Sequence, residues 1–476
     1  MNKILLPIVM WAMSVMPGMA AAPDTGWRAG AASVDITPNY PVRLSGYGSR
    51  TTETVKVMHP IHANALVVQW KKDQPAVIVT VDNCGVPAYL REDVLQRLAK
   101  AGRPVAAERL ALHSTHTHSA PMLRGVLPHL FGADLSPEEA KRVDQYTEDL
   151  TQKIVEVVKA ASDKMEAARL DWGSGRAYFA FNRRLPVGTG FQNAQNFSGP
   201  TDRALPVLRV KSADGQRLIA THASYACHCT TLGENEIHGD WAGMAQAEME
   251  LRFPGSVCLF AIGCGADQNP YPRRETRFLM EHGVAAAKQV VNVINKPMRA
   301  LSGPLNCATK QVELPFDKLP TTEEWKTRSA DKNKWVAHHA KKHLEMLERG
   351  EKIPTSLPYM VQVWNYGSDL LTINLPGEVV VDYSLRFKKE FDEARTWVNS
   401  YTNDVPCYIP SQRVWEEGGY EAAGAMTYYG RPTRFASGIE AIITEAVREL
   451  VPKDFITTRL QPAPLPLGNN YFIGGE

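Results

Sequence analysis

The amino-acid sequence predicts an α/β protein, built as a layered mixed β-sheet domain with helical insertions. Short apolar, β-branched runs alternate along the chain with amphipathic helical patterns, which is typical of helices packed on a sheet. The chain has 476 residues, 44% of them hydrophobic, so it is long enough to enclose a buried site. The sequence shows no internal repeat and no interdomain linker. We therefore expect one large domain over residues 23–476, preceded by a leader at residues 1–22.

The leader has the layout of a secretory signal peptide. Lys3 precedes an apolar stretch, Pro17–Gly18 breaks it, and small residues follow at positions 20–22. This stretch is short and interrupted, and no later run approaches the roughly 18 apolar residues that a spanning helix needs. We expect a cleaved leader and a secreted or periplasmic protein without a transmembrane span. An uncleaved N-terminal anchor is the alternative.

Strands and helices then follow in turn. The long helix expected over 136–161 begins at Ser136–Pro137–Glu138–Glu139, a favourable helix start, and the runs 63–69 and 75–81 form a plausible hairpin. The other expected strands are 31–36, 109–113, 205–211, 217–224, 256–262, 359–364 and 370–375, and the other expected helices are 92–101, 241–252, 380–395 and 434–450.

The segment 315–355 differs from the rest because it is polar and rich in Lys and Glu. We expect a solvent-exposed helical insertion there. His339 and His343 stand four residues apart in it, a spacing that can hold zinc on one helix face. Lysines surround them and no acid of the HExxH type is near, so we expect no metal at this pair.

Charge and motifs exclude several functions. Lys and Arg total 53 against 51 Asp and Glu, a formal net charge of +2, and positive charge is not concentrated in a run. Nucleic-acid binding needs such a concentrated field, so we exclude it. The chain also lacks the GxSxG, Walker, GxGxxG and HExxH motifs. An HxH pair occurs in amidohydrolase barrels, but the regular βα series of those barrels is not visible here.

Histidines are concentrated in one part of the chain. Of 13 histidines, seven fall between positions 113 and 238. His116 and His118 follow a strand-like run and project to the same face of extended backbone, so both can converge on one ion or substrate. Two packed histidines at a strand end are the alternative. His228 lies between Cys227 and Cys229, which we expect to be buried thiols or disulfide-bonded rather than ligands.

Three further segments carry polar groups that suit a metal or substrate site. His238 and Asp240 can ligate a metal or orient its ligands. Asp267 and Asn269 follow a hydrophobic strand in a glycine-rich turn, a common place to present polar side chains. Glu378 follows another buried-looking strand. A carboxylate that interacts with a helix dipole is the alternative for Glu378.

Taken in order, these clusters resemble the neutral ceramidase family, also called neutral/alkaline non-lysosomal ceramidases. The resemblance starts at Gly30–Pro38 (GAASVDITP) and at the Gly46–Gly48 turn. Thr115–Pro121 (THTHSAP) is similar to the family's THTHSGP, and Phe181–Arg184 (FNRR) resembles its asparagine–arginine segment. The resemblance implies the layered fold of the family's N-terminal domain.

The resemblance also implies roles for individual residues. Carried over position by position, the zinc ligands are His116, His228, Glu378 and Tyr408. His118 then stands beside these ligands, Tyr420 contacts the reacting carbonyl, and Arg183 faces the active site. Without the resemblance, the two tyrosines would be taken for packing residues.

Two positions depart from the family pattern. Asn269 stands where the family has its nucleophilic serine, and a carboxamide cannot be that nucleophile, although it can donate a hydrogen bond to an oxyanion or a sugar hydroxyl. His238 takes a position that is usually small. The chain also stops soon after the tyrosine region, so the resemblance is to a short bacterial form without the C-terminal sandwich domain.

From these features we expect a secreted, zinc-dependent hydrolase that cleaves an amide (N-acyl) bond by metal-activated water. The residues expected to serve catalysis are His118, Tyr420, Asn269 and Asp240, and those expected to contact substrate are Arg183, Asp267 and His238. His118 or Asp240 would carry the proton to the leaving amine. The alternatives are the same Zn²⁺ site acting on a carbohydrate derivative or another polar ester or amide, and a non-catalytic binding protein. The expected partner is a small-molecule, lipid or glycan substrate, and the sequence does not predict an oligomeric state.

Overall fold

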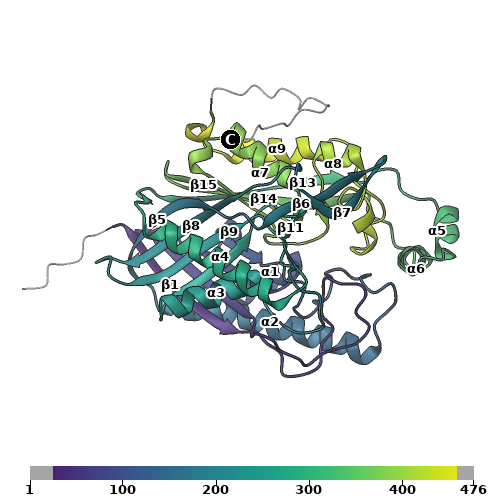
Figure 1. Ribbon diagram of the computed structural model, residues 1–476, viewed down its shortest axis with the longest axis horizontal. Coiled ribbons are helices and arrows are strands. Elements are labelled where there is room, and N and C mark those ends of the chain that lie inside the picture. Colours follow the sequence, from purple (N-terminus) through teal and green to yellow (C-terminus); the bar gives the residue numbers. More distant parts are fainter. Residues whose placement is uncertain (1–24, 458–476) are drawn as a thin grey trace, which may run out of the picture.

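The computed structural model describes residues 25–457 and arranges them in layers (Figure 1). Helices cover one face of a nine-stranded sheet, the other face packs on a four-stranded sheet, and further helices cover that second sheet. The expected fold class, a layered mixed α/β domain, is confirmed. The expected signal peptide at residues 1–22 lies outside the described residues.

The nine-stranded sheet has the strand order β10-β9-β8-β5-β1-β2-β3-β4, with the short β12 beside β5. The β1–β2 and β2–β3 pairs are antiparallel, whereas β3–β4 and β9–β10 are parallel, so the sheet is mixed. The strands are β1 (Trp27–Asp35), β2 (His62–Trp70), β3 (Ala76–Val81), β4 (Leu110–Ser114), β5 (Glu166–Arg176), β8 (Ala204–Ser212), β9 (Leu218–Tyr225), β10 (Val257–Ile262) and β12 (Arg299–Ala300).

Both faces of this sheet are buried, which the alternation of side chains along a strand makes possible. In β2, Ala63, Ala65 and Val67 join the core on the helix side, whereas Leu66 and Val68 join the core between the two sheets. The helices on the first face are α1 (Ala88–Lys100), α2 (Pro137–Asp163), α3 (Asp240–Arg252) and α4 (Thr276–Ile294).

The second sheet contains β13 (Leu305–Pro315), β14 (Ser356–Tyr366), β15 (Leu370–Asn374) and β17 (Thr396–Asn399). Trp364 and Trp397 from this sheet meet Trp172 of β5 in the core between the sheets. The helices α7 (Val381–Glu390) and α9 (Ile439–Leu450) pack against the second sheet, and Figure 1 shows them on its far side.

Two small sheets complete the fold. One has the order β11-β6-β7, and in the other β16 and β18 are parallel. Their strands are β6 (Ala180–Val187), β7 (Gly190–Asn196), β11 (Gln268–Pro270), β16 (Glu378–Val379) and β18 (Tyr408–Ile409). The remaining elements are α8 (Gln412–Glu417) and the 3₁₀ helices η1 (Ala107–Arg109), η2 (Glu393–Arg395), η3 (Gly424–Thr427) and η4 (Lys453–Phe455). Among residues 25–457, no helix combines the length and the apolar character needed to cross a membrane.

The connection between β13 and β14 contains α5 (Thr322–Ser329) and α6 (Lys334–Glu348), at the right of Figure 1. The expectation of a solvent-exposed insertion is wrong for one face of α6, where His338, His339 and His343 are buried. His339 Nε2 lies 2.9 Å from the Arg431 carbonyl oxygen, and His343 Nδ1 lies 2.9 Å from that of His339. The His339 ring therefore joins α6 to the segment of Arg431, whereas the His343 ring donates within α6 itself.

Candidate metal centre

Four segments that are far apart in the sequence converge at one point. His116 follows β4 and His228 follows β9, and the residues next to them, Thr117 and Cys229, form a parallel bridge that sets the two loops side by side. Glu378 begins β16. Directly opposite Glu378 in β18 stands Tyr408. The structure thus brings together the residues expected to be the ligands.

Three electron-rich atoms meet at the centre of this group. The Nε2 atoms of His116 and His228 lie 3.1 Å and 3.2 Å from Oε2 of Glu378. All three side chains are buried, at 3% exposure or less. Glu378 Oε2 accepts no hydrogen bond from any described residue. Lone pairs and a carboxylate at this distance repel one another. The arrangement is therefore stable only with a positive charge between the three atoms.

The other nitrogen of each histidine fixes the tautomer. His116 Nδ1 lies 2.6 Å from the Cys84 carbonyl oxygen and His228 Nδ1 lies 2.7 Å from that of Gly265, so each Nδ1 carries a proton that it donates. A neutral ring then presents an unprotonated Nε2. Histidines that bind metal ordinarily have this partner on their second nitrogen. The donor set therefore fits a divalent metal ion.

The pKa shifts agree with a site built for a cation. Burial alone would raise the pKa of Glu378, but His116 and His228 hold it well below its usual range. Burial would lower the pKa of His116, but Glu378 and Cys84 raise it to about 10. Burial and Arg183 lower the pKa of His228 to about 4. Without a metal, a proton on His116 therefore supplies the missing charge, and a metal ion would displace it.

Tyr408 completes the group from the side. Its hydroxyl oxygen lies 3.4 Å from His228 Nε2 and accepts a hydrogen bond of 2.9 Å from Arg183 Nη2. Arg183 Nη1 lies 3.2 Å from His228 Nε2. Because a guanidinium only donates, this contact also requires a lone pair on that nitrogen. Glu421 fixes Arg183 by accepting from its Nε at 2.9 Å.

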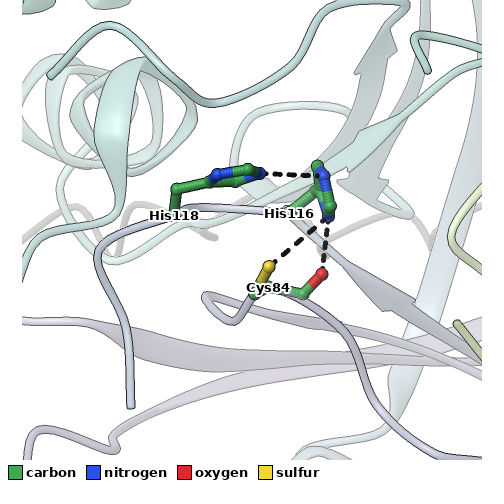
Figure 2. A group of neighbouring side chains, drawn as sticks. All are labelled: Cys84, His116 and His118. Carbon is green, nitrogen blue, oxygen red and sulfur yellow. Dashed lines mark hydrogen bonds between the residues drawn. The ribbon is translucent and has the colours of Figure 1, made fainter. Parts of the chain in front are cut away.

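His118 faces the same point. Figure 2 shows the ring of His116 with its Nδ1 edge toward Cys84 and its Nε2 edge toward His118. The two Nε2 atoms lie 3.1 Å apart. Burial, together with the charge on His116 and His228, holds the pKa of His118 well below its ordinary value, so this imidazole is neutral.

A pocket of about 240 Å³ opens onto His116, His118 and Glu378. Four tyrosines and one tryptophan contribute to its walls, and Tyr420 stands edge-on to Tyr408 with ring centroids 5.3 Å apart. The other residues around the pocket are Gly46, Tyr47, Gly48, Ser49, Leu127, Leu130, Trp335 and Tyr428. The site is therefore a metal-type centre at the base of a small aromatic pocket.

Asn269 lies behind the centre, in β11. Its Oδ1 accepts hydrogen bonds from Arg183 Nη1 and Thr230 Oγ1, both at 3.4 Å, and its Nδ2 donates to Asn193 at 3.3 Å. The side chain is 1% exposed and does not line the pocket. In this structure it holds Arg183 rather than facing a substrate.

Arg183, which was expected to contact substrate, does not line the pocket either, since it is buried behind Tyr408 and His228. Three other expected residues also lie outside the pocket, which corrects their placement. The Asp240 carboxylate accepts from the backbone N–H groups of Thr231, Leu232 and Trp241. His238 Nδ1 accepts from the Asp240 N–H at 3.1 Å. Asp267 accepts from the Val381 N–H at 2.9 Å and from Asn182 at 3.0 Å. All three are buried, and their contacts are those of groups that fix loops.

Sequence reasoning missed three side chains that support the centre. Tyr429 donates to Oε1 of Glu378, and the Tyr401 ring stacks on His116 with centroids 4.3 Å apart. Glu421 accepts from both Arg183 and Arg184. No spacing pattern links these residues to their partners. All seven cysteines lie within the described residues and are free, including Cys84, whose Sγ is 3.9 Å from His116 Nδ1.

Residues 27–260 match the family model described as neutral/alkaline non-lysosomal ceramidase, N-terminal. Residues 27–260, nearly half of the chain, therefore form an N-terminal domain of this family's type. His116, His118, Arg183 and His228 lie inside the matched stretch, whereas Glu378, Tyr408 and Tyr420 lie beyond it.

Two curated relatives carry the name neutral ceramidase. The one from Drosophila pseudoobscura pseudoobscura is 24% identical over 275 residues, and the one from Drosophila melanogaster is 25% identical over 271 residues. These alignments cover 54% and 53% of this chain but only 38% and 37% of the relatives. The chain therefore matches less than two fifths of the length of these ceramidases.

Solved structures show the same fold over most of the chain. The neutral ceramidase from Pseudomonas aeruginosa matches with a TM-score of 0.68 and 18% identity, covering 93% of this chain and 77% of its own. A ceramidase complexed with C2 matches with a TM-score of 0.69 and 18% identity, covering 92% and 78%. The neutral ceramidase fold thus includes the part that carries Glu378 and Tyr408.

Proposed function

We propose that this protein is an exported, zinc-dependent hydrolase that cleaves the amide bond of an N-acyl compound. The observation that carries the proposal is the convergence of His116 Nε2, His228 Nε2 and Glu378 Oε2 in a buried centre that opens into a pocket. The family supports the bond class, because its named relatives are ceramidases, and ceramides are N-acyl amides.

Zinc is the metal that this donor set favours. Two imidazole nitrogens and one carboxylate, with a further position open to solvent, are the usual ligands of catalytic zinc. Tyr408 offers an additional oxygen, which Arg183 holds in place. The pocket approaches this centre from the side of His118 and Glu378, so a reacting group has access to it.

The chemistry requires a water oxygen to form a bond to the acyl carbon while the carbon–nitrogen bond breaks. A bound divalent ion lowers the pKa of the water and polarises the carbonyl. His118 lines the pocket, and its Nε2 lies 3.1 Å from His116 Nε2, so this imidazole is placed to accept the proton that the water loses and to pass it to the leaving nitrogen. The products are a carboxylate and an amine.

The remaining residues of the centre orient and stabilise. Tyr420 lines the pocket, and its hydroxyl, protonated near neutral pH as in any ordinary tyrosine, is placed to donate a hydrogen bond to the oxyanion. Arg183 positions Tyr408 and is itself held by Glu421 and Asn269. Because Asn269 has no nucleophilic group, direct attack by water replaces a covalent acyl-enzyme.

Export is a separate part of the proposal and depends on the leader at residues 1–22. Fractionation of a bacterial host that expresses the full chain tests it. We expect the protein in the periplasm or medium, shortened by about the length of the leader. Full-length protein in the cytoplasm would contradict export.

A product screen tests the catalytic proposal. The purified protein is incubated with N-acyl lipids and N-acyl glycans, and the products are measured by mass spectrometry. We expect equal amounts of carboxylate and amine from at least one class of substrate. His116→Ala should lower the rate of cleavage by about 100-fold or more. The exposed-loop variant Lys72→Ala serves as the matched control. Cleavage of no amide, or cleavage unaffected by His116→Ala, would contradict the proposal.

A further inference from the structure

The α5–α6 connection is anchored at its base and reaches the pocket at its far end. β13 and β14 pair from Leu305↔Tyr366 to Pro315↔Ser356, and the Phe316 N–H donates to the Thr355 carbonyl at 2.9 Å. The chain between these residues leaves the sheet and returns to the same place.

Three contacts hold α6 against the pocket walls. Trp335 Nε1 donates to the Leu130 carbonyl at 2.9 Å, and Lys342 Nζ donates to Asp134 at 2.9 Å. His339 donates to the Arg431 carbonyl at 2.9 Å. The acceptors belong to two loops that also line the pocket through Leu127, Leu130 and Tyr428. The helix and the pocket walls are therefore one packed unit.

The indole of Trp335 fits a space that glycines leave open. A Cβ atom at Gly132 would lie 3.0 Å from Trp335 Cδ1, and Gly132 has a positive φ of 63°. A Cβ atom at Gly48 would lie 3.3 Å from Trp335 Nε1 and 2.5 Å from the Leu130 carbonyl oxygen. Such close packing shows that this wall is built into the fold.

The pocket is small and partly open to solvent. A volume of about 240 Å³ falls below the roughly 300–1,000 Å³ that is usual for sites that bury a drug-sized ligand. Tyr428 stands edge-on to Trp335 with centroids 6.3 Å apart, which extends the closed wall. A long acyl chain that runs toward Trp335 and Tyr428 would have to displace this side of the pocket, whereas a short acyl group would not.

The wall also carries polar groups that lack partners. The hydroxyls of Tyr420 and Tyr428 make no hydrogen bond to any residue in the range 25–457, although both side chains line the pocket. Aromatic faces with free hydroxyls suit a polar group such as a hydroxylated ring or chain better than a second hydrocarbon tail. This points to a polar amine on the other side of the scissile bond.

We propose that Trp335 determines specificity by closing the pocket, so that the substrate is a compact amide with a short acyl group on a polar amine. This inference depends on the proposed amide hydrolysis for its chemistry. The shape of one pocket wall, which the β13–β14 connection supplies, would then distinguish this protein from enzymes that act on two-chain lipids.

The test compares N-acetyl-, N-hexanoyl- and N-palmitoylglucosamine as substrates. The wild type should prefer the acetyl compound in kcat/KM, and Trp335→Ala should raise the hexanoyl-to-acetyl ratio by about 10-fold or more. Trp335→Phe is the conservative variant and should keep most of the wild-type preference. Thermal unfolding of each variant shows whether the fold persists. A wild type that cleaves the palmitoyl compound as well as the acetyl compound would overturn the inference.

Binding of the product acids separates this inference from the catalytic proposal. Isothermal titration of the zinc-loaded protein with acetate, hexanoate and decanoate should show a preference for acetate that Trp335→Ala reduces. If no amide is cleaved but this binding pattern holds, the hydrolase proposal fails and the size limit stands. If decanoate binds the wild type as tightly as acetate, the size limit fails even when amides are cleaved.

Discussion

The Tyr429 hydroxyl donates a hydrogen bond to Oε1 of Glu378, while Oε2 of the same carboxylate faces His116 and His228. The two oxygens of Glu378 therefore have different surroundings. One is fixed by a tyrosine, and the other is left free of hydrogen bonds. A partner of this kind orients a metal ligand and is often as important as the ligand itself.

Tyr429→Phe removes this hydrogen bond and keeps the ring. We expect zinc to bind about 10- to 100-fold more weakly, because the carboxylate loses its fixed orientation. Competition with a zinc chelator measures the affinity. Tyr428→Phe is the matched control, since that hydroxyl makes no hydrogen bond to the residues at 25–457. Equal affinity of Tyr429→Phe and wild type would contradict this role.

Glu421→Gln weakens two buried ion pairs, because Glu421 accepts from Arg183 Nε at 2.9 Å and from Arg184 Nη1 at 2.6 Å. Removing one partner of a buried pair leaves an uncompensated charge and costs about 3–5 kcal/mol. We expect a loss of unfolding free energy in this range from urea denaturation, and a lower kcat with little change in KM. Glu417→Gln, at a more exposed partner of Arg184, should cost less. Equal costs would show that burial of Glu421 is not decisive.

Stability should fall in acid through buried histidines such as His113. Burial lowers the pKa of His113 to about 3, whereas the unfolded chain has an ordinary histidine pKa near 6.5. The folded state therefore binds fewer protons between these values. The unfolding free energy rises with pH through this window and is fully present above about pH 6.5.

The slope is up to about 1.4 kcal/mol per pH unit for one such group. Urea unfolding at pH 5, 6 and 7 measures it, and His113→Gln should flatten the profile. Asp404, whose pKa burial raises to about 6, acts in the opposite direction, so the difference between variant and wild type isolates His113. Parallel profiles for the two proteins would contradict this assignment.

The sequence patterns that predicted the fold are local. Ser136 accepts from the Glu139 N–H and Glu139 accepts from the Ser136 N–H, which starts α2 where the sequence predicts a helix. The helix α4 was not predicted. It contains Gly283, which weakens a helical pattern, but a Cβ atom there would lie 2.5 Å from Met244. Close packing of α4 on α3 thus requires a residue that disfavours helix locally.

In the candidate site, too, sequence motifs indicate some residues, whereas others are recognised only from their contacts in the folded chain. The ordered motifs indicate His116, His228, Glu378 and Tyr408 by resemblance, and the structure brings these four together. Tyr429 and Glu421 contact partners 51 and 238 residues away, so no local period indicates them. Trp335 lies in a polar segment, and only its packing on Leu130 makes it a pocket wall. Asp240 and Asp267 looked like site residues because buried acids that fix loops also follow strands and turns.

We propose that His116, His228 and Glu378 together hold one metal ion. The most direct test measures the metal content of the purified protein, after zinc loading and dialysis, by inductively coupled plasma mass spectrometry. We expect about one zinc per chain in the wild type and in the control His59→Ala, and a loss of zinc in His116→Ala and Glu378→Gln. A wild type without zinc, or undiminished zinc in both ligand variants, would contradict the account.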